Sequence, residues 1–369
     1  MSSSDAPQLA PTRRLVIGGA LAIGLSPVAT AGGRRDTLIA GSYTREGGPG
    51  LLTLAHSARG WRRIALADGI RNASFGVCSV TGLRYLVDEQ EHGAIGIYDR
   101  DLRRLAVLPT LGADPCHVAL RGDGGALAVA NYSSGTVTHW RLDPATGLPI
   151  GQPQSISHAG YAPAGGVQAP HAHWVGWVAD GSLLHSVDLG ADAILAHDID
   201  PGTGRCRATA IAYRAPAGSG PRHLVRNPHR PVAYLISELS NTVTLLDAQA
   251  DGTFSARAIL STLPADFVGK SAAAHIAINR RGTRLYVSNR GHDSIAVFAL
   301  SAHGDITPIQ HVACGGHWPR MFLLREDAGE LLVANEHSGD IGQLVVRPDG
   351  RLGAATPIAS VPGIAFLAT

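Results

Sequence analysis

Four side chains whose types suit ester chemistry lie far apart in the sequence: His171, Arg222, Glu238 and Arg290. Guanidinium groups stabilise the oxyanion that forms when a carbonyl is attacked, and imidazole or carboxylate groups transfer protons. Gathered in one pocket, these groups would suit the chemistry of an ester. The chain must then fold so that segments about fifty residues apart meet at one place.

Each of these residues belongs to a recurring signal. A His or Arg beside Pro, Gly or Ala begins one apolar strand, and an Asn, Asp or Glu about fifteen residues later ends the next. The pairs are His117 with Asn131, His171 with Asp188, Arg222 with Glu238, His275 with Asn289 and Arg320 with Asn335. Two short strands and a hairpin use up that length, so both ends of each pair should lie on the same side of the fold.

One phrase recurs along the chain with a period near fifty residues. It consists of a short apolar strand, then Asn, Asp, Glu or Gly, then a polar turn and a second apolar strand. The copies begin at Leu38, Tyr85, Ala128, His185, Leu235, Tyr286 and Leu332. This period, with period-2 strands and glycine-containing turns, predicts an all-β fold, a seven-bladed β-propeller with one four-stranded sheet per repeat.

A ring of sheets has no open edge only if its two ends join. The first strand, Leu38–Tyr43, lacks an upstream partner, so we expect Ile358–Leu367 to complete its blade. Residues 37–369 would then be a single propeller domain. The innermost strand of each blade would line a channel, and the polar signals would converge on one mouth.

Composition agrees with such a fold. Apolar residues make up 45% of the chain and charged residues 16%, which leaves ample material for a core. The formal net charge of +2, without a run of Lys or Arg, is untypical of nucleic-acid binding. The four cysteines, Cys78, Cys116, Cys206 and Cys314, are too far apart for a CxxC motif. They could pair in an exported chain or be small buried hydrophobes. Nothing in the pattern specifies an oligomeric state.

Residues 1–31 have the layout of a twin-arginine signal peptide. Arg13 and Arg14 precede an uncharged run from Leu15 to Leu25, and small residues surround Thr30. The Phe and Lys that usually follow the arginines are missing. The run is too short to span a bilayer, so we expect no stable membrane anchor. We expect the chain to be periplasmic or otherwise exported.

Several segments resemble signatures of the seven-bladed propeller lactonases, a family that includes bacterial 6-phosphogluconolactonase and fungal carboxy-cis,cis-muconate cyclase. They are PHAH at 170–173, DLGAD at 188–192, GSGPRH at 218–223, SELSNTV at 237–243 and SNRGHDSI at 288–295. Segments 71–75 and 316–320 are also similar, the first with Ala73 where Pro is usual. The resemblance spans about residues 37–366. It implies a carboxylic ester hydrolase (EC 3.1.1.-) that opens a small sugar lactone without a metal or cofactor.

The resemblance also implies roles for particular residues. The acid–base and oxyanion residues correspond to His171, Glu238, Arg222 and Arg290, and the expected substrate-binding residues are His223, Arg320, Asn289 and Asp188. Glu238 or His171 would assist the attack of water, the arginines Arg222 and Arg290 would hold the oxyanion, and His171 would protonate the leaving alkoxide.

Other roles are open for the same residue types. Strand-end Asp, Glu and Asn often cap turns, and Arg222 with Glu238 could be a structural ion pair. A calcium-dependent lactonase would place Glu238, Asn289 and Asn335 around the ion, and a non-catalytic propeller would bind a partner or a sugar. An exported chain would not meet a phosphorylated lactone made in the cytosol, which favours an unphosphorylated lactone or another cyclic ester.

Overall fold

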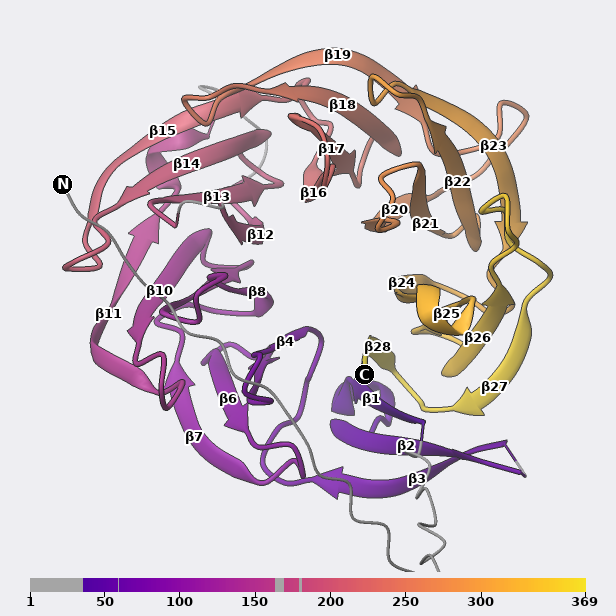
Figure 1. Cartoon of the computed structure of the whole chain (residues 1–369), viewed down its shortest axis with the longest axis horizontal. Coiled ribbons are helices and arrows are strands. Elements are labelled where there is room, and N and C mark those ends of the chain that lie inside the picture. The colour runs from indigo at the N-terminus through magenta and orange to yellow at the C-terminus, as the bar shows by residue number, and fades with distance from the viewer. Residues whose placement is uncertain (1–35, 59, 163–168, 179–180) are drawn as a thin grey trace, which may run out of the picture. The chain divides into compact units, whose positions relative to one another are not determined.

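Seven four-stranded antiparallel sheets surround a central axis, with one strand of each sheet nearest to it (Figure 1). The computed structural model describes residues 36–58, 60–162, 169–178 and 181–369, and Asp36–Thr369 form one compact unit. The predicted seven-bladed propeller is confirmed. The predicted signal peptide, residues 1–31, lies outside the described residues.

The blades follow the chain in order, each written here from its innermost to its outermost strand. They are β28 (Ile364–Ala368), β1 (Thr37–Ser42), β2 (Leu51–Ser57) and β3 (Gly60–Ala67); β4 (Gly76–Cys78), β5 (Arg84–Asp88), β6 (Ala94–Tyr98) and β7 (Arg104–Pro109); β8 (Pro115–Leu120), β9 (Ala126–Asn131), β10 (Thr136–Leu142) and β11 (Pro149–Ser157); β12 (Ala172–Trp177), β13 (Leu183–Asp188), β14 (Ala193–Ile199) and β15 (Cys206–Arg214); β16 (Pro221–Arg226), β17 (Val232–Ser237), β18 (Thr242–Ala248) and β19 (Phe254–Ser261); β20 (Ala272–Ile278), β21 (Arg284–Arg290), β22 (Ser294–Leu300) and β23 (Ile306–Ala313); and β24 (Pro319–Arg325), β25 (Glu330–Asn335), β26 (Asp340–Val345) and β27 (Thr356–Ser360).

Burial decreases from the second strand of a blade to its outer edge. Every residue of β9, β17 and β25 is buried, whereas buried or partly buried positions are interspersed with exposed ones in β7 and β19. A strand covered on both faces needs a continuous apolar run, whereas an edge strand needs apolar residues only on its inner face. The hydrophobic core therefore lies between neighbouring blades.

Tyrosines near the start of the second strand tie three blades to their neighbours. The hydroxyl groups of Tyr85, Tyr234 and Tyr286 donate to the carbonyl oxygens of Gly147, Gly304 and Gly350 at 2.8, 2.8 and 2.9 Å. Those turns need glycine because their φ angles are 68°, 86° and 80°. The buried hydroxyl groups are thereby satisfied, and the blades are fixed at the end where the second strands begin.

The C-terminal strand closes the ring. β28 pairs antiparallel with β1, placing Ala368 opposite Ile39 and Phe366 opposite Gly41, so it becomes the innermost strand of the first blade. The predicted closure is confirmed, but of the expected segment, Ile358–Leu367, only residues 364–367 take part, and the strand continues to Ala368. Thr356–Ser360 instead forms the outer strand of the seventh blade.

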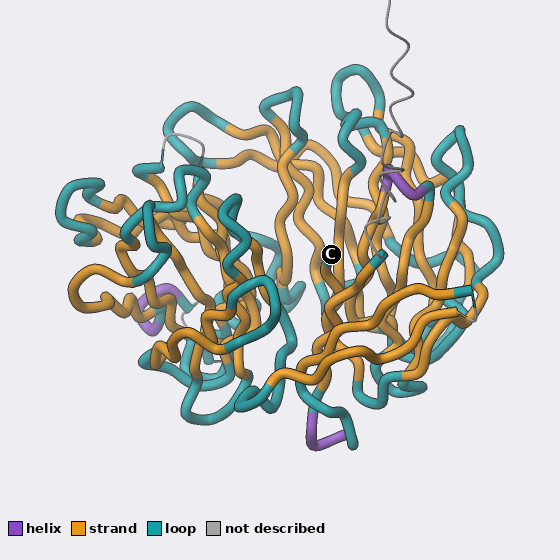
Figure 2. Tube along the Cα trace, turned by 60° about the horizontal axis from the view of Figure 1, so that its bottom comes forward, coloured by secondary structure: helices purple, strands orange, loops and turns teal. Residues whose placement is uncertain are grey.

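The described chain is almost entirely strands and loops (Figure 2). Three 3-10 turns lie in the loops: η1 (Thr44–Glu46), η2 (Ala159–Tyr161) and η3 (Glu326–Ala328). Within this part of the chain, no helix is long and apolar enough to cross a bilayer. All four cysteines lie in it as unpaired thiols: Cys78 is exposed, Cys206 partly buried, and Cys116 and Cys314 buried.

Candidate active site

Bulges at matching places in five blades shape one end of the channel. In each of these blades the innermost strand slips in register just after its first pair with the second strand or, in the sixth blade, just after its second pair. The residues left without a ladder partner are Cys116, His173, Arg222 and Arg320, with Ala274 and His275 in the sixth blade. A bulge redirects a side chain without ending the sheet. We call this end of the channel, where the second strands finish, the mouth.

Arg222, Glu238 and Arg290 meet at the mouth. The Oε2 atom of Glu238 accepts a hydrogen bond from Nε of Arg222 at 2.9 Å and lies 2.8 Å from Nη2 of Arg290. Arg222 comes from the bulge of β16, Glu238 directly follows β17, and Arg290 ends β21 in the next blade. The structure thus brings together three of the four predicted catalytic residues, whose roles stay predictions.

Burial and the neighbouring charges shift the pKa values of Glu238 and Arg222. Burial raises the pKa of Glu238, but Arg290 and Arg222 lower it more, so it lies below its ordinary value. Burial, followed by repulsion from Arg290, lowers the pKa of Arg222 to about 10. Both groups are therefore charged at neutral pH. A carboxylate with a lowered pKa is a weak base, so Glu238 is better suited to holding the two guanidinium groups than to removing a proton.

His171 has a defined tautomer when its imidazole is neutral. Its Nδ1 atom lies 3.1 Å from the carbonyl oxygen of Tyr132, and because a carbonyl only accepts, Nδ1 carries the proton. Nε2 keeps its lone pair, and no hydrogen bond to it is found within the described ranges. The ring stacks on that of Tyr132 with centroids 4.5 Å apart, which fixes its plane. Nε2 is thus available to take a proton from water.

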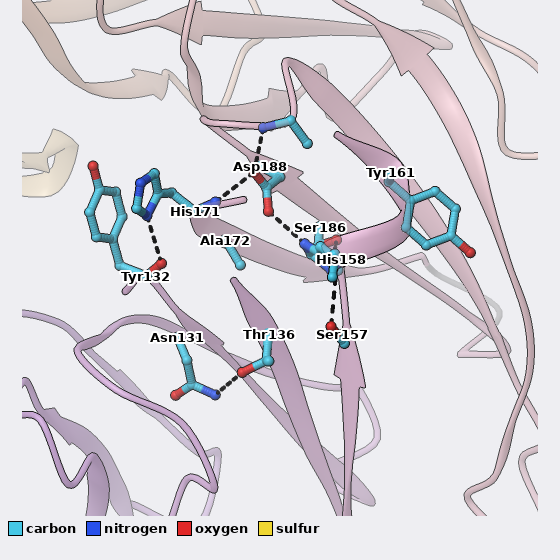
Figure 3. Close-up of polar contacts among 12 residues, drawn as sticks. Asn131, Tyr132, Thr136, Ser157, His158, Tyr161, His171, Ala172, Ser186 and Asp188 are labelled. Atoms are coloured by element: carbon cyan, nitrogen blue, oxygen red, sulfur yellow. Dashed lines mark hydrogen bonds and ion pairs between the residues drawn. The ribbon is translucent and has the colours of Figure 1, made fainter. Parts of the chain in front are cut away.

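Asp188 holds the backbone that carries His171 (Figure 3). Its Oδ1 accepts the N–H of His171 at 2.8 Å, and its Oδ2 lies 2.7 Å from Nδ1 of His158. The next turn can approach this segment because residue 190 is glycine: a Cβ on Gly190 would lie 1.8 Å from the carbonyl oxygen of Ala169. Asp188, predicted to bind substrate, is fully buried in the structure and positions His171.

Asp188, His158 and Ser186 form a chain of hydrogen-bonding groups that the sequence analysis missed. Nε2 of His158 lies 3.3 Å from the Ser186 hydroxyl, which is also 2.8 Å from Nε2 of His197. The order of groups is that of a nucleophilic triad. All of them are at 0% exposure, so a substrate carbonyl cannot reach Ser186. The chain instead anchors the strands that support His171.

Tyr132 connects His171 with the arginines. Besides stacking on His171, its ring lies edge-on to that of His173, with centroids 5.5 Å apart. Burial raises the pKa of its hydroxyl, the charge of Glu238 raises it further, and Arg222 and Arg290 lower it. His173 in turn lies beside His223, with ring centroids 5.2 Å apart, and His223 lies 3.2 Å from Nη1 of Arg222, so a chain of contacts joins Tyr132 to the arginines.

Imidazole rings fill the channel beneath the arginines. The centroid of His223 lies 5.2, 5.3 and 5.5 Å from those of His173, His117 and His275. Burial lowers the pKa of all four rings, that of His275 to about 3, so they are neutral at neutral pH. His223, predicted to bind substrate, lies 3.2 Å from Nη1 of Arg222 and forms part of the floor of the mouth.

Arg320, another predicted substrate-binding residue, centres a second charged cluster. Its Nη2 lies 3.5 Å from Oε2 of Glu89, and its Nη1 lies 3.6 Å from Oε2 of Glu336. The hydroxyl of Tyr43 donates to Glu89 at 2.7 Å, and the Tyr43 ring lies 5.1 Å from the guanidinium carbon. Burial lowers the pKa of Arg320, but Tyr43 and the two glutamates raise it more. This guanidinium is therefore fully charged and already paired.

Asn289, the remaining predicted substrate-binding residue, is fully buried between blades. Its side chain accepts from the Thr262 hydroxyl at 2.7 Å and donates to the Thr262 carbonyl at 2.9 Å. The amide nitrogen of Asn335 donates to Asp340 at 2.8 Å, while its buried Oδ1 accepts no hydrogen bond from the described residues. Of the three residues considered as calcium ligands, Asn289 thus bonds to the scaffold and Glu238 binds two guanidinium groups. Among the described residues, no group of three or more His, Cys, Asp or Glu is arranged to hold a metal ion.

The mouth is lined by the residue after each strand-end residue. Asn131, Asp188, Ser237, Asn289 and Asn335 pair with the first or second residue of the innermost strand, and the residues that follow them are Tyr132, Leu189, Glu238, Arg290 and Glu336. Glu238 therefore occupies the same position in its blade as Arg290 does in the next one. The comparison of the repeats that matched Glu238 with Asn289 is wrong by one residue. When the repeats are aligned by the corrected position, the sequence also indicates Tyr132 and Glu336 as mouth residues.

Trp318, within the similar segment 316–320, is a further mouth residue, although it was not among the predicted site residues. Its ring lies 5.3 Å from the guanidinium carbon of Arg290. Its φ of 67° is in the left-handed region, which costs a non-glycine residue about 1–2 kcal/mol. Asp293 holds it there by accepting its N–H at 2.8 Å. Strain of this kind is typical of functional sites.

Comparison with known proteins gives consistent relatives. Residues 37–364 match the family described as "Lactonase, 7-bladed beta-propeller". The chain is 30% identical over 259 residues to a 6-phosphogluconolactonase of Bacillus subtilis, covering 69% of this chain and 72% of that protein. Among solved structures, the periplasmic gluconolactonase of Pseudomonas aeruginosa is 26% identical with a TM-score of 0.80, covering 90% of this chain and 98% of the other. A Lactobacillus plantarum protein is 26% identical with a TM-score of 0.81 over the same shares.

Proposed function

We propose that this chain, which belongs to the seven-bladed β-propeller lactonase family, is an exported hydrolase that opens a sugar lactone without a metal ion. The family and the relatives described as gluconolactonase and 6-phosphogluconolactonase support lactone hydrolysis. The observation that carries the proposal is the pair of buried guanidinium groups joined by Glu238. His171, next to Tyr132 at the same mouth, supplies the proton-transfer group.

The proposed reaction uses these groups in turn. Arg222 and Arg290 stabilise the lactone carbonyl oxygen most when it becomes an oxyanion, so they favour the transition state over the bound substrate. Glu238 keeps both guanidinium groups in place. Nε2 of His171 takes a proton from the attacking water and returns it to the ring oxygen as the ring C–O bond breaks. The product is a hydroxy acid.

Acid release from the full chain tests this proposal. We expect a pH-indicator assay with gluconolactone to show turnover above the spontaneous rate, unchanged by EDTA, because all the proposed groups are side chains. Loss of turnover with EDTA and its recovery with Ca²⁺ would replace the mechanism with a metal-dependent one. Absence of turnover on gluconolactone, its 6-phosphate and a muconolactone, in folded protein, would favour a binding propeller.

Replacing Arg290 by glutamine is expected to lower kcat by about 10²–10³-fold, as for loss of one oxyanion donor. The change also removes one partner of a buried ion pair, so thermal unfolding must be measured on the same sample. Arg290→Lys is the matched control: it keeps the charge but not the planar fork, and should recover part of the rate. Full activity of folded Arg290→Gln would remove Arg290 from the mechanism.

Export is the second part of the proposal and rests on residues 1–31. The Pseudomonas aeruginosa relative is described as periplasmic. Replacing Arg13 and Arg14 by lysine should retain the chain in the cytoplasm, as judged by cell fractionation. If the wild-type chain and the double-lysine variant were distributed equally between the cytoplasmic and exported fractions, a twin-arginine signal would be contradicted.

A further inference from the structure

The cluster around Arg320 lies at the mouth but takes no part in the chemistry described above. It contains Glu89, Glu336 and Tyr43, and Glu46 lies beside it: burial and the neighbouring Glu336 raise the pKa of Glu46. Trp318 joins the two clusters: its carbonyl oxygen accepts the backbone N–H of Glu336 at 3.0 Å, and its ring lies 5.3 Å from the guanidinium carbon of Arg290. The two clusters therefore border the same space.

Negative charge exceeds positive charge among the buried groups of this cluster. Two glutamates, Glu89 and Glu336, lie within 3.6 Å of the single guanidinium of Arg320, and the partly exposed Glu46 lies beside Glu336. The remaining cation, Arg45, is largely exposed and lies 3.9 Å from Glu46. Exposed cations attract anions weakly because solvent and salt screen them. At the other cluster, Glu238 already pairs with both arginines. Within the part of the chain that the structure describes, the buried guanidinium groups of Arg222, Arg290 and Arg320 thus all have carboxylate partners, which a phosphate would have to displace.

One oxygen of the cluster lacks a hydrogen-bond donor. Glu336 is 4% exposed, and its Oε2 accepts no hydrogen bond from the described residues although Arg320 lies 3.6 Å away. A buried acceptor without a donor costs about 1–3 kcal/mol. A ligand hydroxyl would donate to it. A phosphate dianion has only acceptor oxygens and would repel it.

We infer that the Arg320 cluster binds the hydroxyl-bearing end of an uncharged lactone and rejects a phosphorylated one. This inference rests on the proposed lactonase function and names its substrate class. Glu336 and Glu89 accept from sugar hydroxyls, Arg320 donates to a hydroxyl oxygen, and the excess of carboxylates opposes a phosphate placed there.

Competing substrates test the inference directly. We expect kcat/KM for gluconolactone to exceed that for its 6-phosphate by at least about tenfold, since like charges a few ångströms apart in a partly buried site repel strongly. Added NaCl should raise kcat/KM for the phosphorylated lactone alone, because salt screens that repulsion. Equal or better use of the phosphorylated lactone would overturn the inference.

Isosteric variants locate the effect. Glu336→Gln removes the charge and keeps the shape, so the preference should fall by about tenfold through a lower KM for the phosphorylated lactone. Glu326→Gln, in η3 at the other end of β24, is the matched control and should leave the ratio unchanged. An unchanged ratio in folded Glu336→Gln would overturn the inference, and if that variant does not fold, the salt dependence of the wild-type chain decides.

Failure of the proposed lactonase function can be distinguished from failure of this inference about charge preference. If neither lactone is opened, catalysis fails, and binding of D-glucitol and of its 6-phosphate, followed by tryptophan fluorescence, still decides the charge preference. Tighter binding of the phosphate ester, or binding of neither compound, would overturn the inference.

Discussion

Replacing His171 by alanine is expected to lower kcat for lactone opening by about 10²–10⁴-fold, the usual contribution of a positioned acid–base group. The Tyr132 carbonyl fixes the proton on Nδ1, so Nε2 is the basic atom. Initial rates at neutral pH, with thermal unfolding of the same samples, measure the effect.

Two further variants make the His171 result interpretable. His303→Ala removes an exposed imidazole from the β22–β23 loop, at the other end of the strands, and should leave the rate unchanged. Glu238→Gln keeps the shape of the side chain that joins the arginines. If folded His171→Ala retained the wild-type rate while Glu238→Gln lost it, Glu238 would be the base and the assignment of His171 would be wrong.

Lowering the pH from about 7 to about 5 is expected to destabilise the folded chain steeply. The imidazoles of His117, His173, His223 and His275 have folded-state pKa values below their ordinary value. Below about pH 6.5 the unfolded chain gains protons that the folded chain does not, so the free energy of unfolding falls. Each such ring contributes up to about 1.4 kcal/mol per pH unit until the pH reaches its folded-state pKa.

Urea unfolding across this pH range measures the effect. His117→Phe keeps a ring stacked on Phe75, whose centroid lies 4.2 Å from that of His117, and removes one titrating group. Its slope of unfolding free energy against pH should be shallower by about 1.4 kcal/mol per pH unit. A flat profile between about pH 7 and pH 5 would mean that the channel histidines are not held neutral.

The architecture was predictable because it repeats. Each copy of the phrase carries its own apolar strand, turn glycine and period-2 strand, so errors in one copy do not affect the count. The closure by a C-terminal strand followed from the need to pair the edge of the first strand. Its bounds did not, because Thr356–Ser360 and Ile364–Ala368 are both short apolar segments and only tertiary pairing assigns them to different blades.

The site was less predictable for a local reason. A bulge adds one residue to a strand without a sequence signature, so the direction of Cys116, His173, Arg222 or Arg320 cannot be read from alternation. Aligning the repeats by their polar residue therefore grouped residues that bond to the scaffold with residues that reach the mouth. Asp188 and Asn289 bond to the scaffold, whereas Glu238, one position later in the ladder, reaches the mouth.

The pairing of β28 with β1 also determines when this molecule can finish folding. Until Ile364–Ala368 leave the ribosome, β1 presents an unpaired edge that invites association with other chains. Contacts that span nearly the whole sequence form slowly, so the last step follows synthesis instead of accompanying it. A route that carries folded proteins across a membrane suits such a topology. A route that threads the unfolded nascent chain would have to keep six nearly complete sheets from forming until translocation ended.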